Sequence, residues 1–194
     1  MSDPEVRVLA WQARLKHPAW TATPNAGHRA LAELERRAGL DMLITQNIDG
    51  LHQLAGSSPE IVVEIHGTMR EVMCMSCGDR ASMERALERV RQGEEDPACR
   101  ACGGILKSAT ISFGQSLVPR DVARAQRAAS ACDVFLAIGT SLVVYPVAYL
   151  PQRALDAGAR LAIFNAEPTP YDRRAHAVIR APLGQSLAAL AAIL

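Results

Sequence analysis

The sequence predicts an α/β protein built on a parallel sheet, with a small cysteine-rich module inserted in it. Three observations support this fold class: short continuous apolar runs alternate with amphipathic segments, these runs end abruptly in polar residues, and two C-x-x-C pairs interrupt the alternation. Such alternation is typical of a parallel sheet that helices cover on both faces.

Size and composition limit the number of domains and argue against several kinds of partner. The 194 residues suffice for one core, or for one core with a small appended module. A net charge of +1 argues against a dedicated nucleic-acid binder. No apolar run reaches the roughly 18 residues that a membrane span needs, and the polar start MSDPEVRV does not resemble a secretory signal. We therefore expect a cytoplasmic protein without a membrane or specific nucleic-acid partner.

Two helices are expected before the first strand. Residues 4–16 place apolar side chains at spacings of three and four. Residues 24–38 follow, with Thr23 as the predicted N-cap, Pro24 at the first helical position and a stop at Gly39.

Polar side chains follow two predicted strands, residues 42–45 and 61–65. In an open α/β sheet, ligands bind beyond the carboxyl ends of the strands, so a site is expected here. A single Asn or His at a strand end is usually a turn former or a satisfied surface group, but several together favour a site. The side chains are Thr45, Gln46, Asn47 and Asp49 after the first strand and His66 after the second.

The α/β alternation resumes after the cysteine-rich stretch, which itself contains a charged helix at residues 83–92. The expected elements are an extended segment at 105–113, helices at 119–131, 146–157 and 184–194, and strands at 134–138 and 161–164.

Four of the five cysteines form two C-x-x-C pairs, Cys74 with Cys77 and Cys99 with Cys102. Two such turns supply four sulfur ligands, the arrangement that Zn²⁺ prefers in a closed structural site. A redox dithiol or simple buried cysteines are the competing interpretations. Because no ligand position is left open, the metal is expected to hold structure rather than perform chemistry. Cys132 stands alone and is expected to be a small core residue.

The motifs TQNIDGLHQLAG and EIHGT, followed by both cysteine pairs, resemble the sirtuins, a family of NAD-dependent protein deacylases. The resemblance implies a Rossmann-like NAD-binding domain at residues 41–72 and 105–194 and a zinc-ribbon module at 73–104. Residues 1–40 would be a helical part of the small domain and the lead-in to the sheet.

The resemblance also implies contacts to NAD. The nicotinamide end would meet Gln46, Asn47, Ile48 and Asp49, and the adenosine end would meet Gly139, Thr140, Ser141, Asn165, Ala166, Glu167 and Leu183. Glycine and serine also occur in ordinary strand-to-helix turns, so the Gly-Thr-Ser segment alone is weak evidence.

The acylated lysine peptide would bind as an added strand. The resemblance places Phe113 and Gly114 beside it, gives the Ile111 carbonyl to the acyl-lysine amide, and lines the acyl channel with Val144. Two residues depart from the family pattern: Ser108 stands where proline is common, and Gln115 where glutamate is common.

Trp11 and Arg14 align with the Tyr and Arg of sirtuins that act on succinyl- or malonyl-lysine. Arginine suits a terminal carboxylate because it can form paired hydrogen bonds to it. The alternative is an ordinary amphipathic helix with Trp11 buried and Arg14 solvated.

His66 is the catalytic residue that the resemblance implies. It would act as general base on a ribose hydroxyl after the acyl oxygen has displaced nicotinamide, giving free lysine and O-acyl-ADP-ribose. The ordinary pKa of imidazole, about 6.5, suits this task.

One family segment has no counterpart here. Sirtuins begin with a strand and a Gly-Ala-Gly-x-Ser phosphate loop, whereas this sequence contains no G-x-G. Two hypotheses follow: a deacylase whose first strand and phosphate loop are missing, or a non-catalytic, zinc-stabilised interaction module.

Overall fold

The computed structural model describes residues 3–112 and 114–194, which form two compact units. The first unit contains the N-terminal segment up to Thr23, Thr45–Gly50 and His66–Ser116; the second contains Pro24–Ile44, Leu51–Ile65 and Leu117–Leu194.

A parallel three-stranded sheet forms the centre of the second unit. Its order is β6 (Val134–Ile138), β7 (Arg160–Phe164) and β8 (Ala177–Ile179), all parallel. The predicted α/β class with a parallel sheet is confirmed. Strand β8 was not predicted from the sequence, because its apolar run is only three residues long and is partly exposed.

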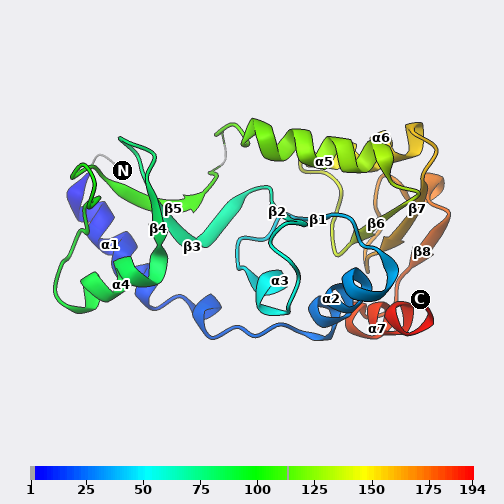
Figure 1. The fold of residues 1–194 in the computed structure, drawn as a ribbon, viewed down its shortest axis with the longest axis horizontal. Coiled ribbons are helices and arrows are strands. Elements are labelled where there is room, and N and C mark those ends of the chain that lie inside the picture. The colour runs from blue at the N-terminus through cyan, green and yellow to red at the C-terminus, as the bar shows by residue number, and fades with distance from the viewer. Residues whose placement is uncertain (1–2, 113) are drawn as a thin grey trace. The chain divides into compact units, whose positions relative to one another are not determined.

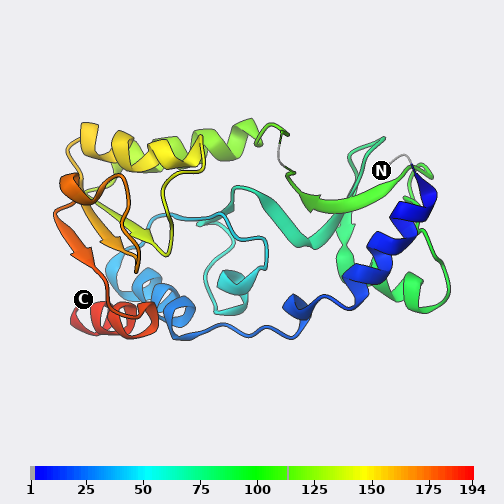
Figure 2. The same ribbon diagram turned by 180° about the vertical axis from the view of Figure 1, so that it is seen from behind.

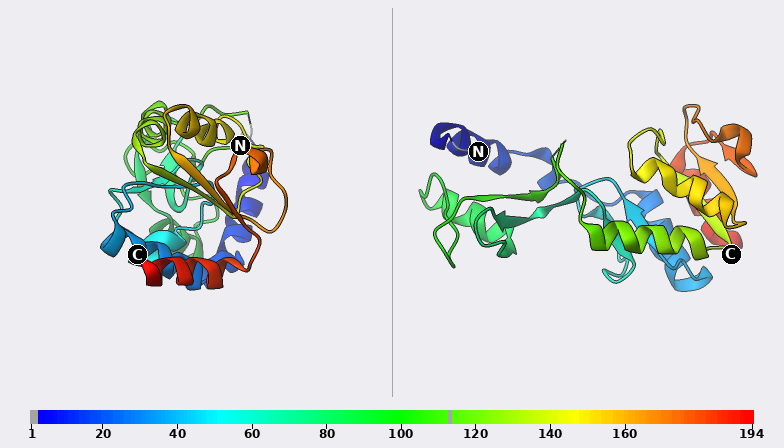
Figure 3. Two further views of the ribbon diagram at one scale, coloured as in Figure 1. Left: turned by 90° about the vertical axis from the view of Figure 1, so that its right-hand side faces the viewer. Right: turned by 90° about the horizontal axis from the view of Figure 1, so that it is seen from above.

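Helices cover both faces of this sheet (Figures 1 and 3). Strand β6 shows the packing on each face, because successive side chains of a strand point to opposite faces of the sheet. Phe135 packs against a cluster from two helices, whereas Leu136 packs against a cluster from the other two. The first pair is α5 (Pro119–Ala131) and α6 (Leu150–Asp156), and the second is α2 (Ala26–Ala38) and α7 (Leu183–Ile193).

A separate two-stranded sheet joins β1 (Leu43–Thr45) to β2 (Val62–Glu64). The backbone N–H of Leu43 donates to the carbonyl of Ile61 at 3.0 Å. The short helix α3 (Leu51–Leu54) lies between the two strands in the sequence.

An antiparallel sheet forms the first unit, in the order β4 (Arg80–Ser82), β3 (Gly67–Cys74), β5 (Leu106–Thr110). The helices α1 (Pro4–Leu15) and α4 (Met83–Arg91) lie beside this sheet (Figure 2). They pack with it around a core that includes Trp11, Val72 and Leu87. The predicted domain boundaries at residues 72 and 105 differ from this division. Pairing between β3 and β5 draws the segments on both sides of the cysteine module into one unit.

Some predicted helix boundaries were wrong. Helix α2 is capped by Asn25 rather than Thr23, because the Asn25 side chain accepts from the backbone of His28 while the His28 ring faces the backbone N–H of Asn25. The predicted helix at 146–157 is divided into the 3₁₀ turn η2 (Val147–Tyr149) and α6. Two further 3₁₀ turns are η1 (Pro18–Trp20) and η3 (Asp172–Arg174).

No helix in the described part of the chain is both long and apolar enough to cross a lipid bilayer.

Gly67 provides a test of the β3–β5 pairing. Its φ is +76°, and a methyl group there would collide with the carbonyl oxygen of Ala109. We expect Gly67→Ala to lower the free energy of unfolding by about 3 kcal/mol, from backbone strain and this collision. Gly93→Ala is the control, because Gly93 also has a positive φ of +98° but open space around it, and should cost about 1 kcal/mol. Equal losses in chemical denaturation would refute the close approach.

Candidate active site

The loop after β1, residues 46–49, is tied to the start of β3 within the first unit. Three carbonyls of the loop accept hydrogen bonds, two from side chains and one from a backbone N–H, so its conformation depends on His66 and the strand that follows it. The hydrogen bonds join the His66 ring to the Gln46 carbonyl at 3.1 Å, Met69 N–H to the Ile48 carbonyl at 2.8 Å, and Arg70 Nε–H to the Asp49 carbonyl at 2.8 Å.

The contact between His66 and the Gln46 carbonyl determines which nitrogen of the imidazole ring carries the proton. The ring atom that faces Gln46 is Nδ1, and a carbonyl oxygen can only accept a hydrogen bond. Nδ1 must therefore carry the proton, which leaves the lone pair of the neutral imidazole on Nε2. The half-buried His66 thus presents Nε2 as a base.

The other loop side chains differ in exposure. Asn47 and Ile48 are exposed, whereas Gln46 and Asp49 are half-buried. The backbone N–H of Asn47 donates to the Thr45 hydroxyl at 3.1 Å, which turns the chain as it leaves β1.

Arg70 is a further residue of this loop's surroundings that was not predicted from the sequence. Its guanidinium lies 5.1 Å from the centre of the Trp20 ring while Nε holds the Asp49 carbonyl. A methyl group on Gly50, which has φ +70°, would lie 3.0 Å from the Arg70 side chain. No motif of the sequence marked this position, because Arg70 meets Asp49 and Trp20 only in the folded unit.

The residues assigned to the peptide follow β5 in the same unit. The backbone N–H of Ile111 donates to the carbonyl of His66 at 2.9 Å, so these two residues are adjacent. Gly114 is exposed with φ +84°. Phe113 lies outside the described residues. The side-chain carbonyl of Gln115 accepts from the backbone N–H of Ser112 at 2.9 Å, which closes the turn.

In the second unit, polar groups collect where β6 and β7 end. Ile138 pairs with Phe164 in register, so the residues that follow them leave the sheet side by side. Gly139 donates its N–H to the Phe164 carbonyl at 2.8 Å, and a methyl group on it would lie 3.1 Å from Leu183. The Thr140 hydroxyl accepts from the backbone of Leu142 at 3.3 Å, and Ser141 and Val144 are exposed.

The segment after β7, residues 165–167, is called the ribose loop below. Asn165 Nδ2 donates to the carbonyl of Glu167 at 2.8 Å. Since that carbonyl only accepts, the amide is oriented with Oδ1 as its remaining acceptor. Ala166 and Glu167 are exposed. An acceptor at a strand end and a neighbouring glycine turn that keeps the backbone accessible both fit a nucleotide ribose.

Trp11 lies in the core of the first unit. Its side chain is 1% exposed, and Nε1–H donates to Asp96 at 3.2 Å. This burial agrees with the packing interpretation of Trp11. Arg14 is half-buried, with its guanidinium 4.8 Å from the centre of the Trp11 ring. Burial lowers the pKa of Arg14, and the described residues provide no carboxylate partner for it.

The four paired cysteines form a compact sulfur cluster in the first unit. All four Sγ atoms lie within 4.8 Å of one another, with 3.5 Å between Cys74 and Cys102 and 3.8 Å between Cys77 and Cys99. A tetrahedron with Zn–S bonds of about 2.3 Å has edges of about 3.8 Å, so the donor set fits Zn²⁺. A hydrogen bond from the backbone of Cys77 lowers the pKa of Cys74 to about 6, although burial opposes the shift.

Cys132 lies apart from this cluster. It is half-buried between α5 and β6, where its Sγ faces the carbonyl of Ala129 at 3.5 Å. Burial raises its pKa, which disfavours the reactive thiolate. This environment agrees with the expected packing role.

These features define an α/β protein with a nucleotide-type strand-end site and a four-cysteine metal centre. The Sir2 family profile matches residues 3–146. The chain belongs to the Sir2 family, the sirtuins.

Curated relatives agree with this assignment. The "NAD-dependent protein deacetylase 2" of Streptomyces coelicolor is 51% identical over 190 residues, which cover 98% of this chain and 79% of the relative. The "NAD-dependent protein deacetylase 1" of Bradyrhizobium diazoefficiens is 42% identical over 189 residues, with 96% and 74% covered.

Solved structures show the same fold. "Sir2 bound to acetylated peptide" has a TM-score of 0.83 at 31% identity and covers 90% of this chain and 72% of its own. "Sir2-p53 peptide-NAD+" has a TM-score of 0.82 at 32% identity, with 90% and 71% covered. "Structure of Sir2Tm bound to a propionylated peptide" has a TM-score of 0.82 at 28% identity, with 98% and 84% covered.

The cysteine cluster yields a prediction about stability. We expect Cys99→Ser to lose zinc and to unfold the first unit, because a small core depends on its structural metal. Cys132→Ser is the matched control and should keep its zinc. Metal content by atomic emission and thermal unfolding by circular dichroism measure both effects. Normal zinc content in Cys99→Ser would contradict the four-sulfur site.

Proposed function

We propose that this protein is an NAD-dependent protein-lysine deacylase that yields nicotinamide and O-acyl-ADP-ribose. The observation that carries the proposal is the hydrogen bond from His66 Nδ1 to the Gln46 carbonyl, which leaves Nε2 as the base. Membership of the Sir2 family and relatives named as NAD-dependent deacetylases support it.

Two sets of residues are proposed to hold NAD. The loop at 46–49 would contact the nicotinamide and its ribose, and the strand-end residues of the second unit would contact the adenosine. The second set is Gly139, Thr140, Ser141, Asn165, Ala166, Glu167 and Leu183. Neutral acceptors such as Asn165 Oδ1 suit ribose hydroxyls, which are donors.

His66 is proposed as the general base. Its Nε2 would accept the proton of a ribose hydroxyl, and the Gln46 carbonyl would stabilise the resulting imidazolium through Nδ1–H. Bound NAD supplies the ADP-ribosyl group that accepts the acyl chain. The backbone of Ile111, which is hydrogen-bonded to His66, is proposed to orient the acyl-lysine amide beside this base.

The acylated peptide is proposed to pair with the backbone around residues 111–115 and to place its acyl chain near Val144. Backbone pairing gives affinity with little dependence on the peptide sequence. Structural neighbours with acetylated and propionylated peptides support such a substrate.

Zinc is proposed to hold Cys74, Cys77, Cys99 and Cys102 together without taking part in the reaction. Four thiolates leave no open position for water or substrate. Thiols that serve as metal ligands suit a reducing compartment, so we propose a cytoplasmic location, which fluorescence microscopy of a tagged chain would test.

His66→Ala tests the proposed chemistry. We expect NAD-dependent release of nicotinamide from an acetyl-lysine peptide to fall at least about a hundredfold, since a general base contributes that much or more. His17→Ala, which removes an exposed imidazole from the same unit, should keep full activity. Retained activity in His66→Ala would remove His66 from this role. No release by the unaltered chain would favour the non-catalytic interaction module.

Substitution of Arg14 tests whether the protein prefers an acidic acyl group on the lysine. A half-buried guanidinium without a carboxylate partner among the described residues suits an acidic acyl chain. We expect Arg14→Met to reduce kcat/KM for a succinyl-lysine peptide about tenfold and to leave the acetyl-lysine value unchanged. Arg80→Met, an exposed arginine of the same unit, is the control. Equal succinyl rates in Arg14→Met and the unaltered chain would end this proposal.

A further inference from the structure

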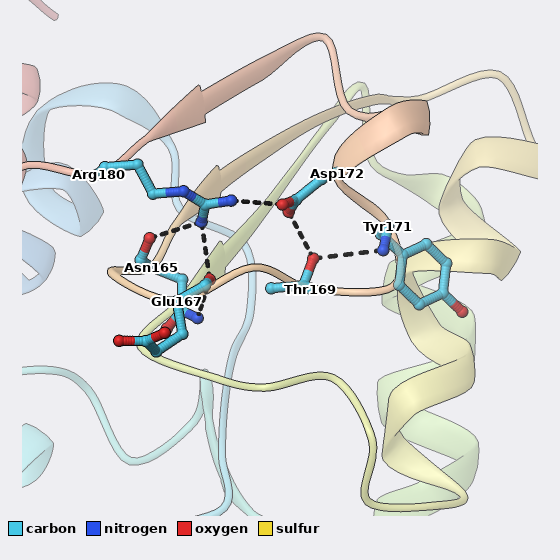
Figure 4. A network of polar contacts seen from close by, with 6 residues as sticks. All are labelled: Asn165, Glu167, Thr169, Tyr171, Asp172 and Arg180. Carbon is cyan, nitrogen blue, oxygen red and sulfur yellow. Dashed lines mark hydrogen bonds and ion pairs between the residues drawn. The ribbon is translucent and has the colours of Figure 1, made fainter.

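A polar network encloses the ribose loop from the side of β8 (Figure 4). Arg180, the residue after β8, donates from one nitrogen, Nη1, to the carbonyl of Asn165 at 2.7 Å and to the carbonyl of Glu167 at 2.8 Å. Its other nitrogen, Nη2, pairs with the carboxylate of Asp172. A single guanidinium therefore bonds both ends of the ribose loop and a residue of the following turn.

The carboxylate of Asp172 is itself anchored. The Thr169 hydroxyl donates to it at 2.8 Å, and the Thr169 side chain is buried. The hydrogen bond from Thr169, together with the ion pair to Arg180, lowers the pKa of Asp172. On the far side, the Tyr171 hydroxyl donates to the carbonyl of Ala148 at 2.8 Å, which joins the turn to η2.

The network sets the orientation of Asn165. The Glu167 carbonyl accepts from both Arg180 and Asn165 Nδ2. Arg180 holds this carbonyl in place, and the carbonyl in turn holds the Asn165 amide with Oδ1 as the remaining acceptor. Loss of Arg180 would free the loop backbone to rotate. The Glu167 carbonyl would then no longer hold the Asn165 amide in this orientation.

From this geometry we infer that Arg180 is a positioning residue for NAD, one that acts through the ribose loop without touching the cofactor. The inference rests on the proposed function, because it assumes that Asn165 binds the adenine ribose. Asp172 supports Arg180 in this role, because its carboxylate neutralises the guanidinium and fixes its direction. The two charges of the pair cancel.

The first experiment measures the loop itself. Arg180→Met should speed backbone amide hydrogen exchange in peptides that cover residues 165–172, because the loop carbonyls lose their donor. The control is Arg173→Met, which removes an equal charge from η3; the Arg173 side chain is exposed and makes no hydrogen bond or ion pair in the described part of the chain. Unchanged exchange in folded Arg180→Met would overturn the inference whether or not the protein is a deacylase.

The second experiment measures the effect on NAD. Arg180→Met should raise the KM for NAD about tenfold and leave the KM for the acetyl-lysine peptide unchanged. Arg180→Lys should recover part of this loss, since an ammonium group can reach Asp172 or a loop carbonyl but cannot span all three partners. Arg173→Met should behave like the unaltered chain. An equal rise in KM for Arg173→Met would show a general charge effect and overturn the positioning role.

Asp172→Asn separates positioning from direct binding. If Arg180 acts through the loop, removal of its anchor should raise the KM for NAD, as Arg180→Met does. If Arg180 instead binds a phosphate of NAD, removal of the competing carboxylate should lower that KM, and this result would overturn the inference. Should the unaltered chain release no nicotinamide, the proposed function would fail, while the exchange experiment would still decide whether Arg180 holds the loop.

Discussion

The hydrogen bond between His66 and the Gln46 carbonyl is the interaction on which the proposed chemistry depends. It joins the residue that precedes β3 to the residue after β1, and two further hydrogen bonds from β3 secure the rest of the loop. The same contact places the imidazole proton on Nδ1 and leaves Nε2 to act as a base. Position and protonation of the proposed catalytic group thus share one cause.

Arg70 and Arg180 each stabilise a loop within their own unit, and they do so in similar ways. Each guanidinium follows or belongs to a strand and donates to backbone carbonyls of a loop at the end of another strand. Arginine suits this task because its donors diverge in one rigid plane and can hold several acceptors at once.

The sequence predicted the features that depend on local spacing. Apolar runs marked β6 and β7, and the C-x-x-C pairs marked the sulfur cluster, since both patterns are confined to a few residues. The pairing of β3 with β5 was not predictable in this way, because it joins segments on either side of the cysteine module.

The same contrast between local spacing and long-range contacts applies to the residues of the candidate site. The positions of Gln46 and His66 at strand ends could be read from the sequence, whereas the network of Arg180 could not, because its partners become neighbours only when β8 joins β7. The environment of Trp11 was not predictable either: its alignment with a ligand contact gave no sign that the indole would be buried and bonded to Asp96.

The tautomer of His66 is the most direct test of this account. Nitrogen-15 NMR of the labelled protein at pH 8, with His66→Ala used to assign the signals, distinguishes a protonated from an unprotonated ring nitrogen. The account predicts that Nδ1 carries the proton and that Nε2 does not. A spectrum with the proton on Nε2 would contradict it, because the atom assigned as the base would then have no lone pair to offer.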